Sequence, residues 1–314
     1  MSKFFFILFL LLSWLNCFAF VPEQIIFFGD SLSDNGNLYR LLLGVIPRSP
    51  PYFEGRFSNG LTWAENFGKH YYDKYYVGYK VYAYGGATAV LHAPTDKFIA
   101  PTTLENEINQ YLIDSVFKNK SKILYVIWIG GNDYLFAPIS PLFDSKEILT
   151  KKVVNKITWA METLIANGAK YFLILNMPDL SHTPFAKIND MVDKLHDLSL
   201  LHNQKLDVAI YNFKQTYPQL KFFYIDIYHV FNDVITNPAK FNETYHVNIT
   251  DVSHACWEGG YTFGEPESYR VGLAYHQGLL PCNNADEHIF WDQIHPTRIV
   301  HYILSEYVFD NVRF

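Results

Sequence analysis

The sequence predicts an α/β fold, a three-layer sandwich in which a mainly parallel central sheet carries helices on both faces. Two patterns predict it. Short, almost wholly apolar runs recur along the chain, and longer stretches with an apolar residue at nearly every third or fourth position lie between them. The short runs are typical of strands covered on both faces, and the long stretches are typical of amphipathic helices. Strands that alternate with helices in this way indicate parallel pairing.

Four apolar runs provide the expected strands. The first covers residues 24–28 and stops at Gly29, and the others cover residues 123–129, 171–175 and 222–227. Between them we expect helices at residues 103–116, 146–167 and 191–217, and the chain closes with a helix at residues 299–309.

No repeat, low-complexity tract or Pro/Gly-rich linker divides the chain, so we expect one domain from residue 20 to residue 314. Two segments, residues 43–59 and 237–284, are expected to be long irregular connections. Connections of this kind often carry function.

The first 19 residues have the pattern of a secretory signal peptide. Lys3 precedes an unbroken apolar run over residues 4–12, and residues 17–19 (Cys-Phe-Ala) place small residues at the usual cleavage position. The alternative is an uncleaved membrane anchor, but crossing a bilayer takes about 20 apolar residues, roughly twice the length of this run. We therefore expect residues 1–19 to be removed and the protein to be secreted, to the periplasm or outside the cell.

Removal of that segment takes away Cys17 and leaves two cysteines, Cys256 and Cys282. In a protein bound for an oxidising compartment this even number predicts a disulfide, with two unpaired buried thiols as the alternative. The disulfide would close a loop of 25 intervening residues and stabilise the fold by roughly 3 kcal/mol on the chain-entropy model. The same loop lies just ahead of Asp292 in the sequence, so it could also gate access to a site there.

Composition excludes one class of partner. The net charge of −6 becomes −7 without Lys3, with 24 basic against 31 acidic residues, and no basic block interrupts the chain, so nucleic acid is not an expected partner. Aromatic residues make up 18% of the chain and are concentrated in residues 71–84. Rings with a polar tip suit a boundary between water and apolar material, although ordinary strands are the plainer interpretation of that stretch.

Polar residues that follow two of the expected strands are candidates for chemistry. In open α/β sheets the ligand crevice lies beyond the carboxyl ends of the strands. The first strand is followed by residues 29–37 (Gly-Asp-Ser-Leu-Ser-Asp-Asn-Gly-Asn), and the strand at 123–129 is followed by residues 130–133 (Gly-Gly-Asn-Asp). The Ser31 hydroxyl could attack an ester if a base takes its proton and if donors such as the Asn132 amide receive the oxyanion.

A base for Ser31 is expected among the 12 histidines, and sequence position favours His295. Asp292 stands three residues before it, and Pro296 biases His295 towards an extended conformation in the turn that enters the closing helix. A carboxylate at this spacing can reach the imidazole Nδ1 and leave Nε2 free for Ser31. The alternative is that Asp292 caps the helix and His295 only packs.

Other chemistries have less support. His288, Asp292 and His295 could together bind a metal ion, but the zinc pattern H-E-x-x-H and cysteine pairs with zinc-finger spacing are absent from the sequence. The phosphate-binding pattern G-x-x-x-x-G-K-[ST] and the dinucleotide pattern G-x-G-x-x-G are absent as well, so we expect neither a metal nor a cofactor. The nucleophile-elbow pattern G-x-S-x-G is incomplete, because Ser33 replaces its second glycine.

Four blocks, in this order, resemble those of the GDSL, or SGNH, lipases and esterases. They are residues 29–37, residues 84–88 (Tyr-Gly-Gly-Ala-Thr), residues 131–133 (Gly-Asn-Asp) and residues 292–296 (Asp-Gln-Ile-His-Pro). Residues 55–60, 176–179 and 202–203 are similar to further segments of the family, so the resemblance covers nearly the whole mature chain. It departs from the family at Val81, where an asparagine is common.

The resemblance implies an SGNH-hydrolase fold, of the flavodoxin-like kind, and a set of roles. Ser31 would be the nucleophile, His295 the base and Asp292 its acid, while the oxyanion would be held by Ser31, Gly86 and Asn132. The sequence is most similar to secreted bacterial phospholipases and lysophospholipases, including enzymes related to glycerophospholipid:cholesterol acyltransferases. In those enzymes too a cysteine pair precedes the Asp-His block.

This similarity implies a lysophospholipid or phospholipid substrate at a micelle or membrane surface, cleaved through an acyl-enzyme, with a sterol as one potential acyl acceptor. Two alternatives stay open: an esterase for small soluble or carbohydrate esters, and a surface-binding protein that has lost its chemistry. Fluorophosphonate labelling distinguishes the second alternative from an active enzyme.

Overall fold

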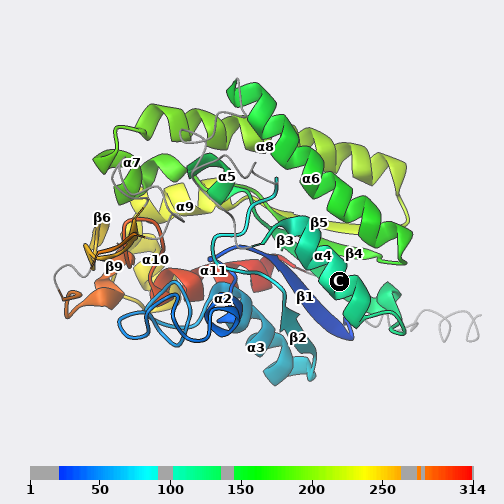
Figure 1. The fold of residues 1–314 in the computed structure, drawn as a ribbon, viewed down its shortest axis with the longest axis horizontal. Coiled ribbons are helices and arrows are strands. Elements are labelled where there is room, and N and C mark those ends of the chain that lie inside the picture. The colour runs from blue at the N-terminus through cyan, green and yellow to red at the C-terminus, as the bar shows by residue number, and fades with distance from the viewer. Residues whose placement is uncertain (1–20, 91–101, 136–144, 263–273, 277–279, 313–314) are drawn as a thin grey trace, which may run out of the picture.

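The computed structural model describes residues 21–90, 102–135, 145–262, 274–276 and 280–312 (Figure 1). The expected signal peptide lies outside these residues, as does part of the segment between Cys256 and Cys282. Among the described residues, no helix is both long and apolar enough to cross a membrane.

The centre of the fold is a parallel sheet of five strands in the order β2-β1-β3-β4-β5. Its strands are β1 (Gln24–Gly29), β2 (Gly78–Val81), β3 (Ile123–Trp128), β4 (Tyr171–Leu175) and β5 (Lys221–Ile225). This confirms the α/β class, because each parallel strand needs a crossover connection and the crossovers here carry helices.

Helices cover both faces of the sheet because successive side chains of a buried strand point to opposite sides. The helices of the two layers are α3 (Trp63–Tyr75), α4 (Leu104–Asp114), α6 (Lys146–Ala166), α8 (Val192–Thr216) and α11 (Arg298–Asn311). Ile26 and Phe28 of β1 pack into one apolar cluster with α4, α6 and α8, while Ile25 and Phe27 pack into another with α3 and α11. In Figure 1, α6 and α8 lie on one side of the sheet and α3 and α11 on the other.

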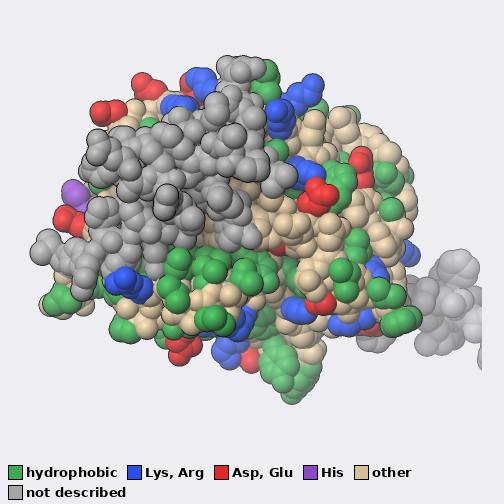
Figure 2. All heavy atoms as spheres, in the orientation of Figure 1, with side chains coloured by type: hydrophobic (Ala, Val, Ile, Leu, Met, Phe, Trp, Pro, Cys, Tyr) green, Lys and Arg blue, Asp and Glu red, His purple; other side chains and the backbone are tan. Residues whose placement is uncertain are grey.

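The remaining elements lie around the sheet. They are the helices α2 (Asn37–Leu41), α5 (Gly131–Leu135), α7 (Pro184–Ile188), α9 (Ile227–Thr236) and α10 (Pro238–Tyr245), and the strands β6 (Asp251–Ala255), β7 (Gly260–Thr262), β8 (Ala274–His276) and β9 (His288–Phe290). β6 pairs in parallel with β9, and β7 pairs antiparallel with β8. On the face seen in Figure 2, basic and acidic side chains are interspersed rather than gathered by sign.

Two expectations about local structure were incomplete. Residues 237–284 are not simply an irregular connection, because α10, β6, β7 and β8 all fall within them. The aromatic stretch 71–84 is divided between the end of α3 and the edge strand β2. Its most exposed members, Tyr72, Tyr75 and Tyr76, lie where α3 leads into the amino end of β2, which is the opposite end of the sheet from the carboxyl ends.

Candidate active site

The turn after β1 presents Ser31 at the carboxyl end of the sheet. Asp30 O accepts hydrogen bonds from Ser33 N at 3.0 Å and Asp34 N at 2.9 Å, which closes a tight turn around Ser31. The strand before it must end in glycine, because a Cβ on Gly29 would lie 2.4 Å from the carbonyl oxygen of Trp128 on β3. The sequence thus turns directly at the edge of the sheet and leaves the serine above it.

The carboxylate of Asp34 organises the rest of this turn. It accepts hydrogen bonds from Gly36 N at 2.8 Å, Asn37 N at 2.5 Å and Leu38 N at 3.2 Å at the start of α2, and from Gly85 N at 2.7 Å in the turn after β2. One buried side chain therefore ties together two loops that are 51 positions apart in the sequence.

Ser31, His295 and Asp292 form a continuous chain of hydrogen bonds. His295 Nε2 lies 2.9 Å from Ser31 Oγ, and His295 Nδ1 lies 2.8 Å from Asp292 Oδ2 and 3.0 Å from Oδ1. The Asp292 carboxylate also accepts the backbone N–H groups of Ile294 at 2.8 Å and His295 at 2.7 Å. The side chains of Ser31, His295 and Asp292 are all buried. The structure therefore brings together residues that are 264 positions apart, with geometry suited to proton transfer.

Two aromatic residues that the sequence analysis did not single out support this chain. Tyr52 donates a hydrogen bond from its hydroxyl to Asp292 Oδ2 at 2.5 Å, and the ring of Phe57 lies against the imidazole of His295 with centroids 5.1 Å apart. Burial alone would raise the pKa of Asp292, but the charge and hydrogen bonds of His295 and the Tyr52 hydroxyl hold it below its ordinary value. The Asp292 carboxylate is therefore kept ionised. The only sequence signal for Tyr52 was its place in the irregular segment 43–59.

Asn132 lies in the first turn of α5, directly after β3, and lines the same cavity as Ser31 and His295. Its Nδ2 donates one hydrogen bond to Ala87 O at 2.8 Å, which orients the amide and leaves its second N–H available. Gly86 precedes Ala87 and has a φ of 75°, a conformation that favours glycine. The described lining of the cavity includes Ser31 and Asn132 but not Gly86, so the part of Gly86 in an oxyanion site stays a prediction.

Two further carboxyl groups lie beneath Ser31. Burial raises the pKa of Asp30 to about 7 and that of Glu107, on α4, well above its usual range. Glu107 Oε2 accepts Gly29 N at 2.9 Å, whereas its Oε1 has no hydrogen-bond partner among the described residues. A protonated, neutral Glu107 fits this apolar setting better than a carboxylate.

An apolar cavity opens beside Ser31 and His295. It has a volume of about 80 Å³ and reaches between α9 and α11. Its apolar lining on these two helices consists of Ile227, Val230, Phe231, Val234, Val300, Ile303 and Leu304. The arrangement therefore offers an apolar lining to a hydrocarbon group beside the serine hydroxyl.

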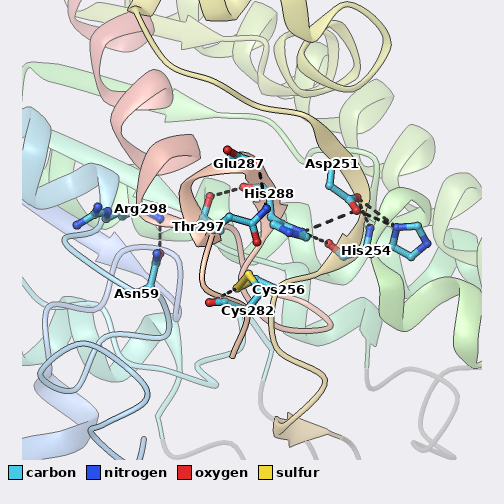
Figure 3. Close-up of a disulfide and its surroundings, with 10 residues drawn as sticks. Asn59, Asp251, His254, Cys256, Cys282, Glu287, His288, Thr297 and Arg298 are labelled. Carbon is cyan, nitrogen blue, oxygen red and sulfur yellow. Dashed lines mark hydrogen bonds and ion pairs between the residues drawn. A yellow bond between two sulfur atoms is a disulfide. The ribbon is translucent and has the colours of Figure 1, made fainter. Parts of the chain in front are cut away.

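The structure separates His288 from the other two residues of the hypothetical metal site. His288 Nδ1 lies 3.3 Å from His254 O and 3.9 Å from Asp251 Oδ2 (Figure 3). His295, by contrast, points to Ser31. Within the described residues, no group of three His, Cys, Asp or Glu side chains is placed to hold a metal ion.

Cys256 and Cys282 are joined by a disulfide next to the strand that leads to Asp292 (Figure 3). Cys256 N donates to Phe290 O at 2.9 Å, and the following residue, Trp257, donates from its N–H to Trp291 O at 2.9 Å. The disulfide thus fixes the chain that runs beside residues 290–292. Its 25-residue loop lies partly outside the described residues, and its effect on access to the site stays a prediction.

A parallel α/β sheet with a Ser-His-Asp chain of hydrogen bonds at its carboxyl end has the construction of a serine hydrolase. The family model of the GDSL-like lipases and acylhydrolases matches residues 25–308, so this chain belongs to that family and is a carboxylic ester hydrolase. The sequence resemblance to GDSL enzymes is thereby confirmed.

Individual relatives agree with the family assignment. The chain is 31% identical to the phosphatidylcholine-sterol acyltransferase of Aeromonas hydrophila over 90% of its own length and 88% of that protein. It is 28% identical to the secreted effector protein SseJ of Salmonella typhimurium over 90% of its own length, but it spans only 62% of that relative. Among solved structures, the acetylxylan esterase Axe2 of Geobacillus stearothermophilus matches 92% of this chain and 93% of its own, with 14% identity and a TM-score of 0.46.

Proposed function

We propose that this protein is a secreted lipase that releases fatty acid from lysophospholipids or phospholipids, with Ser31 as nucleophile, His295 as base and Asp292 as the acid that orients it. The observation that carries the choice of lipid is the apolar cavity between α9 and α11, which begins at Ser31 and His295. The apolar side chains that line this cavity suit the alkyl part of a fatty acyl chain better than a sugar ring. The phosphatidylcholine-sterol acyltransferase, as its name states, acts on such a lipid, and this supports the proposal.

In the proposed reaction, His295 Nε2 takes the proton of the Ser31 hydroxyl as Oγ attacks the ester carbonyl. Asp292 accepts the hydrogen bond of Nδ1–H and stabilises the imidazolium that forms. The tetrahedral oxyanion is received by the backbone N–H groups of Ser31 and Gly86 and by the free N–H of Asn132. His295 then gives its proton to the leaving alcohol, which leaves an acyl group on Ser31 Oγ.

The acyl-enzyme is cleared by a second attack of the same kind. His295 deprotonates a water molecule, which releases the fatty acid and restores Ser31. An alcohol such as a sterol can replace water and then leaves as an ester, which would make the protein an acyltransferase. The name of the Aeromonas relative supports this branch.

Secretion is part of the same proposal. Residues 1–19 have the composition of a signal peptide, and a Cys256–Cys282 disulfide persists in oxidising compartments. We expect the chain to be secreted without residues 1–19. Mass spectrometry of the mature N-terminus tests this.

The deciding experiment compares Ser31→Ala with Ser33→Ala on lysophosphatidylcholine of several chain lengths, with products identified by mass spectrometry. Ser33 lies in the same turn and accepts a hydrogen bond from Trp63 Nε1 at 3.0 Å, so its loss costs some stability but leaves the proposed nucleophile in place. We expect Ser31→Ala to lose turnover and fluorophosphonate labelling at an unchanged melting temperature, and Ser33→Ala to keep both. Retained turnover in Ser31→Ala would contradict the mechanism. Preference for short soluble esters over micellar lipid would contradict the substrate.

A further inference from the structure

The segment of residues 38–53, which we name the docking loop, exposes apolar side chains on one side and is anchored in the active site on the other. Leu41, Leu43 and Val45 are exposed. In the same stretch Leu42 and Ile46 turn inward and pack against a buried cluster that includes Tyr52 and Phe57. The loop therefore has an inner face that belongs to the core and an outer face of similar composition that no described residue covers. Figure 2 shows apolar side chains gathered on the surface over this region.

The outer face is held open at a conformational cost. Leu43 has a φ of 53°, in the left-handed region that a bulky side chain rarely adopts, and 91% of it is exposed. Gly44 follows with a φ of 83°. Backbone hydrogen bonds that close the end of α2, from Leu43 N to Arg40 O at 3.2 Å and from Gly44 N to Tyr39 O at 2.8 Å, hold this turn. The exposed Leu43 side chain itself would be better accommodated by an apolar medium than by water.

Charge identifies the kind of surface that fits. The whole chain has a net charge of −6, yet residues 38–53 contain two arginines, Arg40 and Arg48, and no Asp or Glu. Both arginines are exposed, and the hydrogen bonds of Arg40 go to the neutral amide oxygens of Asn35 and Asn37. The arginines suit the anionic headgroups of a phospholipid surface, and the apolar side chains between them suit its acyl chains.

The loop also connects that surface to the chemistry. Tyr52 holds Asp292, Phe57 lies against His295, and Ser58 Oγ donates to Pro296 O at 2.9 Å. A surface that received Leu43 and Val45 would therefore bind the same loop whose far end carries Tyr52, and Phe57 and Ser58 follow shortly after that loop.

We propose that the outer face of the docking loop inserts into anionic phospholipid bilayers and so places the active site at the lipid surface. This rests on the proposed lipid substrate, and it assigns the recognition of the aggregate to Leu41, Leu43, Val45 and the flanking arginines. The enzyme would then take a lipid molecule into the cavity while it is bound to the bilayer.

The test compares two double variants with matched exposure. The loop variant Leu43→Asp/Val45→Asp alters side chains that are 91% and 61% exposed, in that order. The control variant Val116→Asp/Phe117→Asp alters side chains that are 62% and 101% exposed, in that order. The control pair follows α4 and precedes β3, at the amino ends of the strands. Aspartate also tolerates the φ of position 43 better than leucine does, so folding is preserved.

Both variants are made in the full mature chain with Ser31→Ala, so that vesicles stay intact, and sedimented with vesicles of phosphatidylcholine and phosphatidylglycerol at about 4:1. Loss of two apolar anchors and gain of two negative charges should weaken partitioning of the loop variant by roughly tenfold or more, while the control binds like the parent. Equal binding by all three, or equal weakening of both variants, would overturn the proposal. Stronger binding to pure phosphatidylcholine than to the mixed vesicles would also overturn it.

The same substitutions in the active protein separate this proposal from the proposed function. With p-nitrophenyl butyrate, a soluble ester, the loop variant should match the parent, whereas its rate on mixed vesicles should fall by roughly tenfold. An inactive parent on both substrates would refute the proposed function without touching vesicle binding. A parent and loop variant that hydrolyse vesicles equally would refute docking without touching the chemistry.

Discussion

Removal of the Tyr52 hydroxyl by Tyr52→Phe tests how the buried carboxylate of Asp292 is kept ionised. The ring keeps its packing, because its contacts with Phe57 and Trp257, with centroids 5.6 and 5.3 Å away, do not involve the hydroxyl. Among the described contacts, the change removes the hydrogen bond of 2.5 Å to a buried carboxylate.

The magnitude follows from the remaining partners of Asp292. A hydrogen bond to a charged group contributes about 1.5–3 kcal/mol. Three donors stay in place, the N–H groups of Ile294 and His295 and the imidazole Nδ1, so we expect a loss at the lower end of that range, about 1.5 kcal/mol in the free energy of unfolding at neutral pH.

The sign of the pH dependence is fixed by the lowered pKa of Asp292. A carboxyl group whose pKa is lowered in the folded state stabilises the fold at a pH above its pKa in the unfolded chain. This contribution is lost as the pH falls through its pKa in the folded protein. The difference between wild type and Tyr52→Phe should therefore be full at pH 7 and shrink below about pH 4. Urea unfolding at a series of pH values measures it.

Activity gives an independent readout that a merely structural role would not move. A carboxylate without the Tyr52 donor attracts the imidazolium more strongly, so the acid limb of kcat/KM against pH should move to higher pH. Tyr82→Phe is the control, since the Tyr82 hydroxyl donates to the Asp114 carboxylate at 2.8 Å outside the site. The reasoning is refuted if Tyr52→Phe unfolds like wild type at pH 7 and its acid limb stays where the control's limb lies.

Three further predictions follow from the site. Asn132→Ala should lower kcat by about 10²-fold with little change in KM, because it removes a donor to the oxyanion; an effect confined to KM would show a binding role instead. Val234→Phe should reduce kcat/KM for esters of long acyl chains by roughly tenfold, because Val234 lines the cavity at α9, and should change kcat/KM for butyrate esters by less than about twofold. Its control is Val208→Phe, on the exposed face of α8. Glu107→Gln should flatten the fall in unfolding free energy above about pH 5, because a carboxyl group with a raised pKa binds its proton in the folded state and costs up to about 1.4 kcal/mol per pH unit as the pH rises; parallel curves for the two proteins would refute this.

Much of the fold could be predicted from the sequence because burial on both sides leaves a local signature. The apolar runs at β1, β3, β4 and β5 are almost free of polar residues, and the 3.6-residue periodicity of α6 and α8 is long enough to be recognised. β2 was expected only as part of a strand interpretation of the aromatic stretch 71–84, without bounds, because an edge strand is only partly covered. Its residues are exposed or half-buried except Val81, so its sequence lacks that signature.

The candidate site was predicted in part for the same kind of reason. Two of the predicted residues, Ser31 and Asn132, follow the ends of strands, so local sequence places them at the same edge of the sheet. Asp292 and His295 are only three positions apart, so their pairing is local as well. Tyr52 stands 240 positions from Asp292, in a loop whose course no periodicity describes, and so it could not be found in this way.

The sequence by itself determined the four buried strands β1, β3, β4 and β5, the helices α4, α6, α8 and α11, and the polar residues that follow β1 and β3, because all of these depend on neighbours within a few positions. Only the tertiary structure decided that His295 Nε2 meets Ser31, that Tyr52 reaches Asp292, and that an apolar space lies between α9 and α11. These are contacts between distant segments, and their geometry is set by how the packed layers bring the loops together.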